Sequence, residues 1–188
     1  MSAAAAQGVF PALAELPVLV VPVQRAIGTG EPAWRPPGGN AARQLADSII
    51  SDALLMRGAG SKWQFAEEAR RVARRNPTHA ADPDALAVSS LFSLRAGDAL
   101  LEPLASELRG LVALGEARHV LVPMAMHAER DESDPPGTAR VVFTIAVVDA
   151  RLSRVLWTGP VPGEPATEFN AAAIESAATN LANLIVAR

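Results

Sequence analysis

The chain has 188 residues, of which 49% are hydrophobic and 20% are charged, and its formal charge is −3 at pH 7. This composition is typical of a soluble globular protein, and a chain of this length can bury a core of its own as one domain. It contains no cysteine, which excludes disulfides, iron–sulfur clusters, cysteine zinc sites and cysteine nucleophiles. The negative charge argues against nucleic acid as a partner.

Residues 1–16 are predicted to form a flexible N-terminal arm, and residues 17–188 a single domain. The first 14 residues carry no charged side chain, but glutamine, glycine and proline interrupt them. A membrane-spanning helix needs about 20 apolar residues, so we expect no transmembrane segment. The alanine-rich run at 3–7 is similar to the small residues around a signal-peptidase site, which indicates export. An ordinary frayed terminus explains this run equally well.

A strand, a loop and a helix are expected at the start of the domain. The β-branched run at 18–24 predicts a largely buried strand. A loop rich in glycine and proline follows at 28–39 and carries Trp34. Asn40 is suited to cap a helix that ends near Arg57. The packing stripe of this helix is expected to be Leu45, Ile49, Ala53 and Met56.

Four shorter elements are expected next. A strand at 62–65 precedes a helix at 67–75, in which acidic residues come first and arginines last, as the helix dipole favours. The pair Asp82-Pro83 is typical of a helix start and predicts a short helix to about Phe92. A further helix is expected at 98–114, with a leucine stripe that begins at Leu101.

Three successive strands are the clearest signal in the sequence. They are predicted at 118–127, 140–149 and 154–161 and should form an antiparallel meander. Both faces of the middle strand are apolar, so both are expected to be covered, at least in part. An alanine-rich helix over 167–188 closes the chain. This order predicts an α+β fold with a single mixed, mainly antiparallel sheet of about five strands packed by helices.

Three segments resemble packing motifs of a bacterial envelope family. The hairpin IAVVDARLSRVLWTG at 145–159, the strand at 18–23 with the helix segment 44–55, and the segment 111–124 carry the resemblance. The family comprises CsgG-like and TolB amino-terminal-like domains, which include lipoproteins of the LpoB type. The resemblance implies non-enzymatic roles, namely assembling pores, activating cell-wall synthases or docking to envelope complexes. The chain lacks the lipobox cysteine of such lipoproteins, so lipid anchoring is not supported.

No residue pattern in the sequence names a reaction. Phosphate-loop, dinucleotide-binding and nucleophile-elbow motifs are incomplete or missing. His127, Glu129 and Asp131 at a strand end are the residues that a metal-dependent hydrolase would use. A solvated hairpin tip explains them better, because one histidine and two loop carboxylates fall short of a closed metal site. We therefore predict that the chain is not an enzyme and has no catalytic residue, metal or cofactor.

Two groups of residues are candidate partner contacts. Trp34 and Arg35 give the loop at 28–39 the composition of a contact anchor, and burial of Trp34 over the end of the sheet is the equal alternative. A basic ridge for an acidic protein or for anionic lipid headgroups is the second candidate, and its alternative is a solvated face balanced by glutamates. The ridge consists of Arg70, Arg71, Arg74 and Arg75.

The leading hypothesis is a non-enzymatic binding or scaffold module of a bacterial cell-envelope complex that docks through the loop at 28–39 and the N-terminal arm. One alternative is an extrinsic accessory subunit of a large membrane assembly for secretion, cell-wall synthesis or photosynthetic electron transfer. The other is the metal-dependent hydrolase at 127–131. Proteins are the expected partners, homo-oligomers included. The expected location is the periplasm or the membrane periphery, with the cytoplasm as the alternative.

Overall fold

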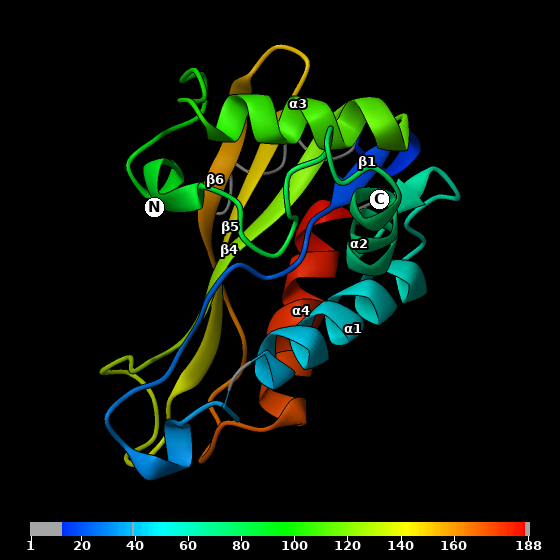
Figure 1. Cartoon of the computed structure of the whole chain (residues 1–188). Coiled ribbons are helices and arrows are strands. Elements are labelled where there is room, and N and C mark those ends of the chain that lie inside the picture. The colour runs from blue at the N-terminus through cyan, green and yellow to red at the C-terminus, as the bar shows by residue number, and fades with distance from the viewer. Residues whose placement is uncertain (1–12, 39, 187–188) are drawn as a thin grey trace.

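A computed structural model of the chain describes residues 13–38 and 40–186. It shows one mixed sheet of six strands with helices packed on it, which confirms the α+β class (Figure 1). The strands are β1 (Val18–Val20), β2 (Ala26–Ile27), β3 (Trp63–Gln64), β4 (His119–Glu129), β5 (Arg140–Asp149) and β6 (Arg154–Pro162). The helices are α1 (Ala41–Met56), α2 (Ala66–Arg75), α3 (Leu104–Gly115) and α4 (Ala171–Ile185).

The predicted N-terminal arm is described only in part. Residues 1–12 lie outside the described residues. Leu13–Glu15 forms a short 3-10 turn, and the side chain of Leu13 is buried in the core. Among the described residues, the domain core therefore already includes Leu13, four residues before the predicted boundary at residue 17.

The sheet has a parallel half and an antiparallel half. Its strand order is β3-β1-β4-β5-β6, and the short strand β2 also pairs with β4. β1 pairs in parallel with β3 and with β4, because α1 crosses over between β1 and β3. β4, β5 and β6 form the predicted meander, and in its register His119 lies opposite Asp149. The two-residue strand β2 is an addition to the predicted elements.

Hydrophobic clusters cover both faces of the sheet, as the apolar middle strand predicts. On one face α1 and α4 pack against a cluster that includes Phe143 and Ile145. On the other face α3 and Ala69 of α2 pack against a cluster that includes Ala146 and Val148. Figure 1 shows α3 crossing the upper part of β4, β5 and β6.

The packing face of α1 differs from the predicted stripe. Met56 is 88% exposed and Leu45 is also exposed, whereas the buried apolar residues lie one position further round the helix. Two alanines share the buried face with Ile50 and Leu54, and these small side chains let α1 approach α4 closely. The buried apolar residues of α1 are Ala42, Ala46, Ile50 and Leu54.

The predicted helix at Asp82-Pro83 does not form. Asp82 Oδ1 accepts the backbone N–H of Asp84 at 3.0 Å, which makes a turn of the chain. The backbone N–H of Leu86 donates to the Gln24 side chain, a tertiary bond that competes with helix formation. In this region only the 3-10 helix Val88–Phe92 is present.

The helix predicted from Asp98 begins later, at Leu104. The preceding residues extend along β6 instead, where Val155 N–H donates to the carbonyl of Asp98 at 2.9 Å and Leu100 N–H donates to that of Ser153 at 2.8 Å. Leu101, predicted in the packing stripe, is 53% exposed. Pairing with a strand edge has replaced the first helical turns.

The outer strand β6 is an edge of the sheet. Its first residues are shielded by the segment around Asp98, and its last part carries Pro160 and Pro162, both exposed. Proline has no N–H group to donate, and such residues are typical of edge strands.

Candidate binding surfaces

The chain leaves the neighbouring parallel strands β1 and β3 toward opposite faces of the sheet. β1 is followed by α1 on one face, and β3 is followed by α2 on the other. In open sheets with parallel strands, the space beyond the carboxyl ends of two such strands is where ligands commonly bind. The described chain places charged side chains at this point.

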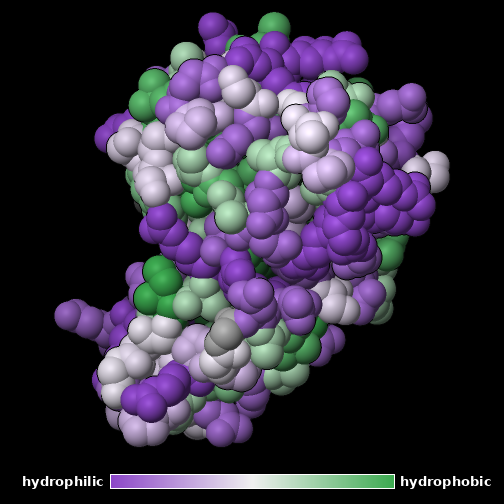
Figure 2. All heavy atoms as spheres, in the orientation of Figure 1, coloured by the Kyte–Doolittle hydropathy of each residue, from purple (hydrophilic) through white to green (hydrophobic). Residues whose placement is uncertain are grey.

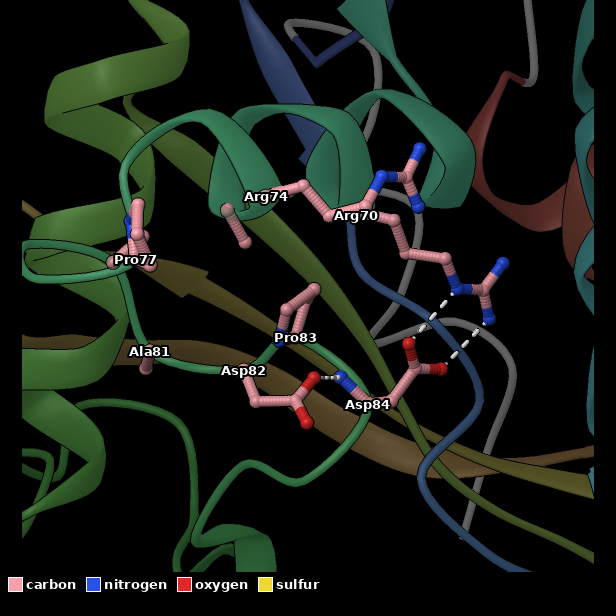
Figure 3. Close-up of a pocket in the computed structure, with 9 residues that line it drawn as sticks. Arg70, Arg74, Pro77, Ala81, Asp82, Pro83 and Asp84 are labelled. Atoms are coloured by element: carbon pink, nitrogen blue, oxygen red, sulfur yellow. Dashed lines mark hydrogen bonds and ion pairs between the residues drawn. The ribbon is translucent and has the colours of Figure 1, made fainter.

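Arg70 of α2 is the centre of this charged group. Its guanidinium is 15% exposed and contacts Asp47 of α1 as well as Asp84. Nε and Nη2 of Arg70 donate to the two carboxylate oxygens of Asp84 at 2.9 and 2.8 Å, as Figure 3 shows. Asp47 Oδ1 also accepts the backbone N–H of Val23 at 2.7 Å. One guanidinium therefore links both helices, the segment after β1 and the loop that follows α2.

The two carboxyl groups beside Arg70 have opposite pKa shifts. Burial raises the pKa of Asp47, although the bonds from Val23 and Arg70 act against the rise. The hydrogen bond from Arg70 lowers the pKa of Asp84, which is less buried. Asp47 therefore depends on Arg70 to remain charged inside the protein.

Gln24 and Arg43 complete the link to the loop. The amide of Gln24 is buried, and its Nε2 donates to the carbonyl of Pro83 at 2.8 Å. Arg43 Nη1 donates to the carbonyls of Gln24 and Asp84 at 3.1 and 3.0 Å. The loop after α2 is thus held by backbone and side-chain bonds at several points. Asp47, Gln24 and Asp84 were not among the predicted site residues.

Two hollows lie on either side of Arg70. One of about 640 Å³ is lined by α1 and α2, and one of about 370 Å³ by α2 and the loop at 77–84. Arg70 and Arg74 line both hollows. The surface over α2 is strongly hydrophilic in Figure 2, and the smaller hollow appears in Figure 3.

The four predicted ridge arginines do not act as one group. Arg70 turns inward, whereas Arg71 pairs with Glu68 and Arg74 Nη2 with Glu67 Oε1 at 2.9 Å. Arg75 is exposed. Arg71 and Arg74 therefore remain exposed, each with a glutamate of α2 as its ion-pair partner.

The loop that carries Trp34 is fixed to the core. Of the two alternatives for Trp34, the structure shows burial, since the side chain is 1% exposed and belongs to the cluster under α1 and α4. The N–H of Phe169 donates to the carbonyl of Ala33 at 2.8 Å, and Glu31 pairs with Arg130. Figure 1 shows the 3-10 turn of this loop beside the β4–β5 hairpin tip at one end of the molecule. Arg35 is exposed there.

The three residues of the metal alternative have separate contacts. His127 Nε2 lies 3.6 Å from Glu129 Oε2, and Asp131 Oδ1 accepts the N–H and the hydroxyl of Ser133. Glu129 and Asp131 line a hollow of about 150 Å³ that does not include His127. Within residues 13–38 and 40–186 no group of three or more His, Cys, Asp or Glu side chains is arranged to hold a metal ion.

A second buried charge lies where β4 begins and β5 ends. Asp149 Oδ2 accepts from Arg118 Nε and Nη2 at 2.9 and 2.7 Å, and Oδ1 accepts the N–H of Leu152 at 3.0 Å. Burial acts to raise the pKa of Asp149, but these bonds outweigh it and the pKa is lowered. Burial lowers the pKa of the neighbouring His119, whose Nδ1 has no hydrogen-bond partner among the described residues.

No protein-family model and no curated protein sequence matches the chain. Among solved structures, it resembles the PelC dodecamer from Paraburkholderia phytofirmans at 20% identity and a TM-score of 0.41, over 93% of this chain and 91% of that one. It also resembles the LpoB C-terminal domain from Salmonella enterica, at 12% identity and a TM-score of 0.41, over 87% of this chain and 98% of that one.

Lipoprotein GNA1162 from Neisseria meningitidis is a third similar structure, at 16% identity and a TM-score of 0.43, over 89% of this chain and 96% of that one. The resemblance of the sequence to LpoB-type, CsgG-like and TolB-like domains stays a prediction. Likenesses this distant assign no role to any residue. Among the described helices, none has the length and apolar character needed to cross a membrane.

Proposed function

We propose that the chain is a non-enzymatic protein-binding module of a bacterial cell-envelope complex, and that it docks through the end of the molecule that carries the loop at 28–38. The observation that carries the proposal is the burial of Trp34 beside an exposed Arg35. A loop held by a buried anchor loses little conformational freedom when it binds, so more of its contact energy is available as affinity.

The surroundings of Arg35 suit a protein contact. Two prolines follow it and restrict the backbone. The exposed pair Glu31 and Arg130 joins the loop to the β4–β5 hairpin tip, so two separate segments present one surface. Charges of both signs at an exposed surface are typical of the rim of an interface.

Two further contacts belong to this proposal. Arg71 and Arg75 lie on the outer side of α2 and are exposed, and they would meet acidic groups of a partner. Residues 1–12 lie outside the described residues, and their role in docking stays part of the proposal.

The envelope location, in the periplasm or at the membrane periphery, rests on the sequence resemblance of the hairpin at 145–159. A second copy of the chain is the alternative partner.

Site-specific photo-crosslinking in the source bacterium tests the docking end. A photoreactive amino acid replaces Arg35 in the full-length chain, and in a matched control it replaces Thr179, an exposed residue of α4. We expect one defined protein to be crosslinked from position 35 and not from position 179. The same adduct from both positions, or none from position 35, would contradict the proposal. Mass spectrometry of the adduct separates a different protein from a second copy of the chain.

A further inference from the structure

The two hollows beside α2 adjoin each other at Arg70 and Arg74, and together we call them the α1–α2 groove. Their volumes are about 640 and 370 Å³, and they share Arg70 and Arg74. Sites that bind small groups or side chains commonly have volumes of this order. The groove opens beyond the carboxyl ends of β1 and β3, where the chain after each strand turns to a different face.

The groove carries a net negative charge, whereas α2 alone carries a net positive charge. Six carboxylates line it against two arginines, an excess of four negative charges, and Arg71 from outside the groove offsets one of them through Glu68. α1 and the loop after α2 supply most of this acidity, which only the tertiary structure brings to α2. The six carboxylates are those of Asp47, Asp52, Glu67, Glu68, Asp82 and Asp84.

Each hollow carries one exposed carboxylate that has no ion-pair partner among the described residues. Asp52 lines the larger hollow, and Asp82 lines the smaller one. Asp82 accepts only the backbone N–H of Asp84, and Figure 3 shows the Asp84 carboxylate turned away from it toward Arg70. Both remain available to an external cation, while Asp47 and Asp84 already share Arg70 as their ion-pair partner.

The smaller hollow also has an apolar wall. Ala73, Pro77 and Ala81 line it, together with Pro83, which is buried. The methylene stem of a lysine or arginine packs on such a surface while its charged end reaches a carboxylate. The groove thus offers both parts of a contact for a long basic side chain.

We propose that the α1–α2 groove binds a basic segment of a partner protein, with one lysine or arginine at Asp52 and another at Asp82. The stem of the second would lie on the wall formed by Ala73, Pro77 and Pro83. This groove is separate from the loop at 28–38. It would bind basic groups of a partner, whereas the outer arginines of α2 would bind acidic ones. The inference therefore does not depend on the proposed docking end.

Binding of short synthetic peptides to the full-length chain tests the inference. The probes are a fluorescein-labelled lysine–alanine peptide and a matching glutamate–alanine peptide, followed by fluorescence anisotropy at low salt, where charge contacts are least screened. The variant is Asp52→Asn with Asp82→Asn, because asparagine keeps the oxygen that accepts the Asp84 N–H. Glu175→Gln, at an exposed position of α4, is the control.

We expect the lysine peptide to bind the unaltered chain and Glu175→Gln equally, and to bind the double variant about tenfold more weakly, the effect of losing two partly exposed ion pairs. An equal loss in Glu175→Gln would show general attraction to an acidic chain and overturn the inference. It is also overturned if the lysine peptide does not bind, or if the glutamate peptide binds more tightly. Arg35→Glu should leave the affinity unchanged, which separates this result from that of the docking end.

Discussion

The antiparallel and parallel halves of the sheet are stabilised by different means. In the antiparallel half, β4, β5 and β6 are nine to eleven residues long, pair with their neighbours in the chain and bury side chains such as Phe143 and Val147. In the parallel half, β1 and β3 have only three and two residues, and Arg70 joins the segments around them through the buried Asp47 and the half-buried Asp84. Both halves bury apolar side chains, such as Val18 and Leu19 of β1, but only the parallel half adds the ion pairs of Arg70.

The largest effect is expected from Phe143→Ala in the antiparallel half. Phe143 is fully buried under α1 and α4, and truncating such a ring costs about 4 kcal/mol of unfolding free energy. Urea unfolding measures the loss, which should be the same at about pH 5 and at about pH 8 because no titrating group is removed. A strong pH dependence of the loss would show that charge also stabilises this half.

Arg70→Met should have the next largest effect, about 3 kcal/mol, because it leaves a buried carboxylate without its partner. Asp47 is 6% exposed, and its pKa is already raised by burial. Adding Asp47→Asn keeps an oxygen for the Val23 N–H and removes the charge, so the double variant should be more stable than Arg70→Met alone. If the double variant is less stable in urea, Asp47 is not the source of the loss.

A smaller effect is expected from pH at the junction of β4 and β5. The pKa of His119 in the folded chain lies below its ordinary value of 6.5, so the unfolded chain binds the proton more tightly. Stability is therefore full above about pH 6.5 and falls as the pH drops below it, by at most about 1.4 kcal/mol per pH unit.

Because the pKa of Asp149 is lowered in the folded chain, a further loss of stability is expected as the pH falls below 3.8, the ordinary pKa of this group. Urea unfolding as a function of pH measures both. His119→Gln should remove the loss just below pH 6.5 and leave the later one. An unchanged pH profile in His119→Gln would assign the first loss to another group.

The smallest effect is expected from Arg71→Ala, next to Arg70 in the same helix. Its pair with Glu68 is exposed, and such pairs contribute about 0 to 1 kcal/mol. The same urea measurement provides the comparison with Arg70→Met. A loss as large as that of Arg70→Met would mean that position in α2, and not burial of the charge, decides the effect.

The elements predicted well are those that local patterns determine. β5, α2 and the start of β6 lie within about one residue of the predictions, because their apolar periods and turns are short-range. The helix at Asp82-Pro83 was wrong because Gln24 and Arg70 hold that loop from distant parts of the chain. Half of the predicted α1 stripe was right, since Ile49 and Ala53 pack on the core. Leu45 and Met56 are exposed, because helical spacing alone does not show which side of α1 meets α4.

The candidate surfaces were harder to predict for the same reason. Helical spacing placed the arginines of α2 correctly on one helix, but the carboxylates that pair with Arg70 are 23 and 14 residues away in sequence. One local signal was present: Asp47 lies between the apolar residues Ala46 and Ile50 on the inner side of α1. A charge on an apolar stripe indicates a buried partner.

The prolines of β6 have a consequence for how copies of this chain can associate. Polymerisation from sheet to sheet, as in fibres, requires a row of free backbone donors along an exposed edge. Pro160 and Pro162 remove donors from one part of this edge, and the segment around Asp98 covers another. Crowded copies are thereby protected from open-ended growth along β6, and association at this edge must use side-chain contacts in place of a shared sheet.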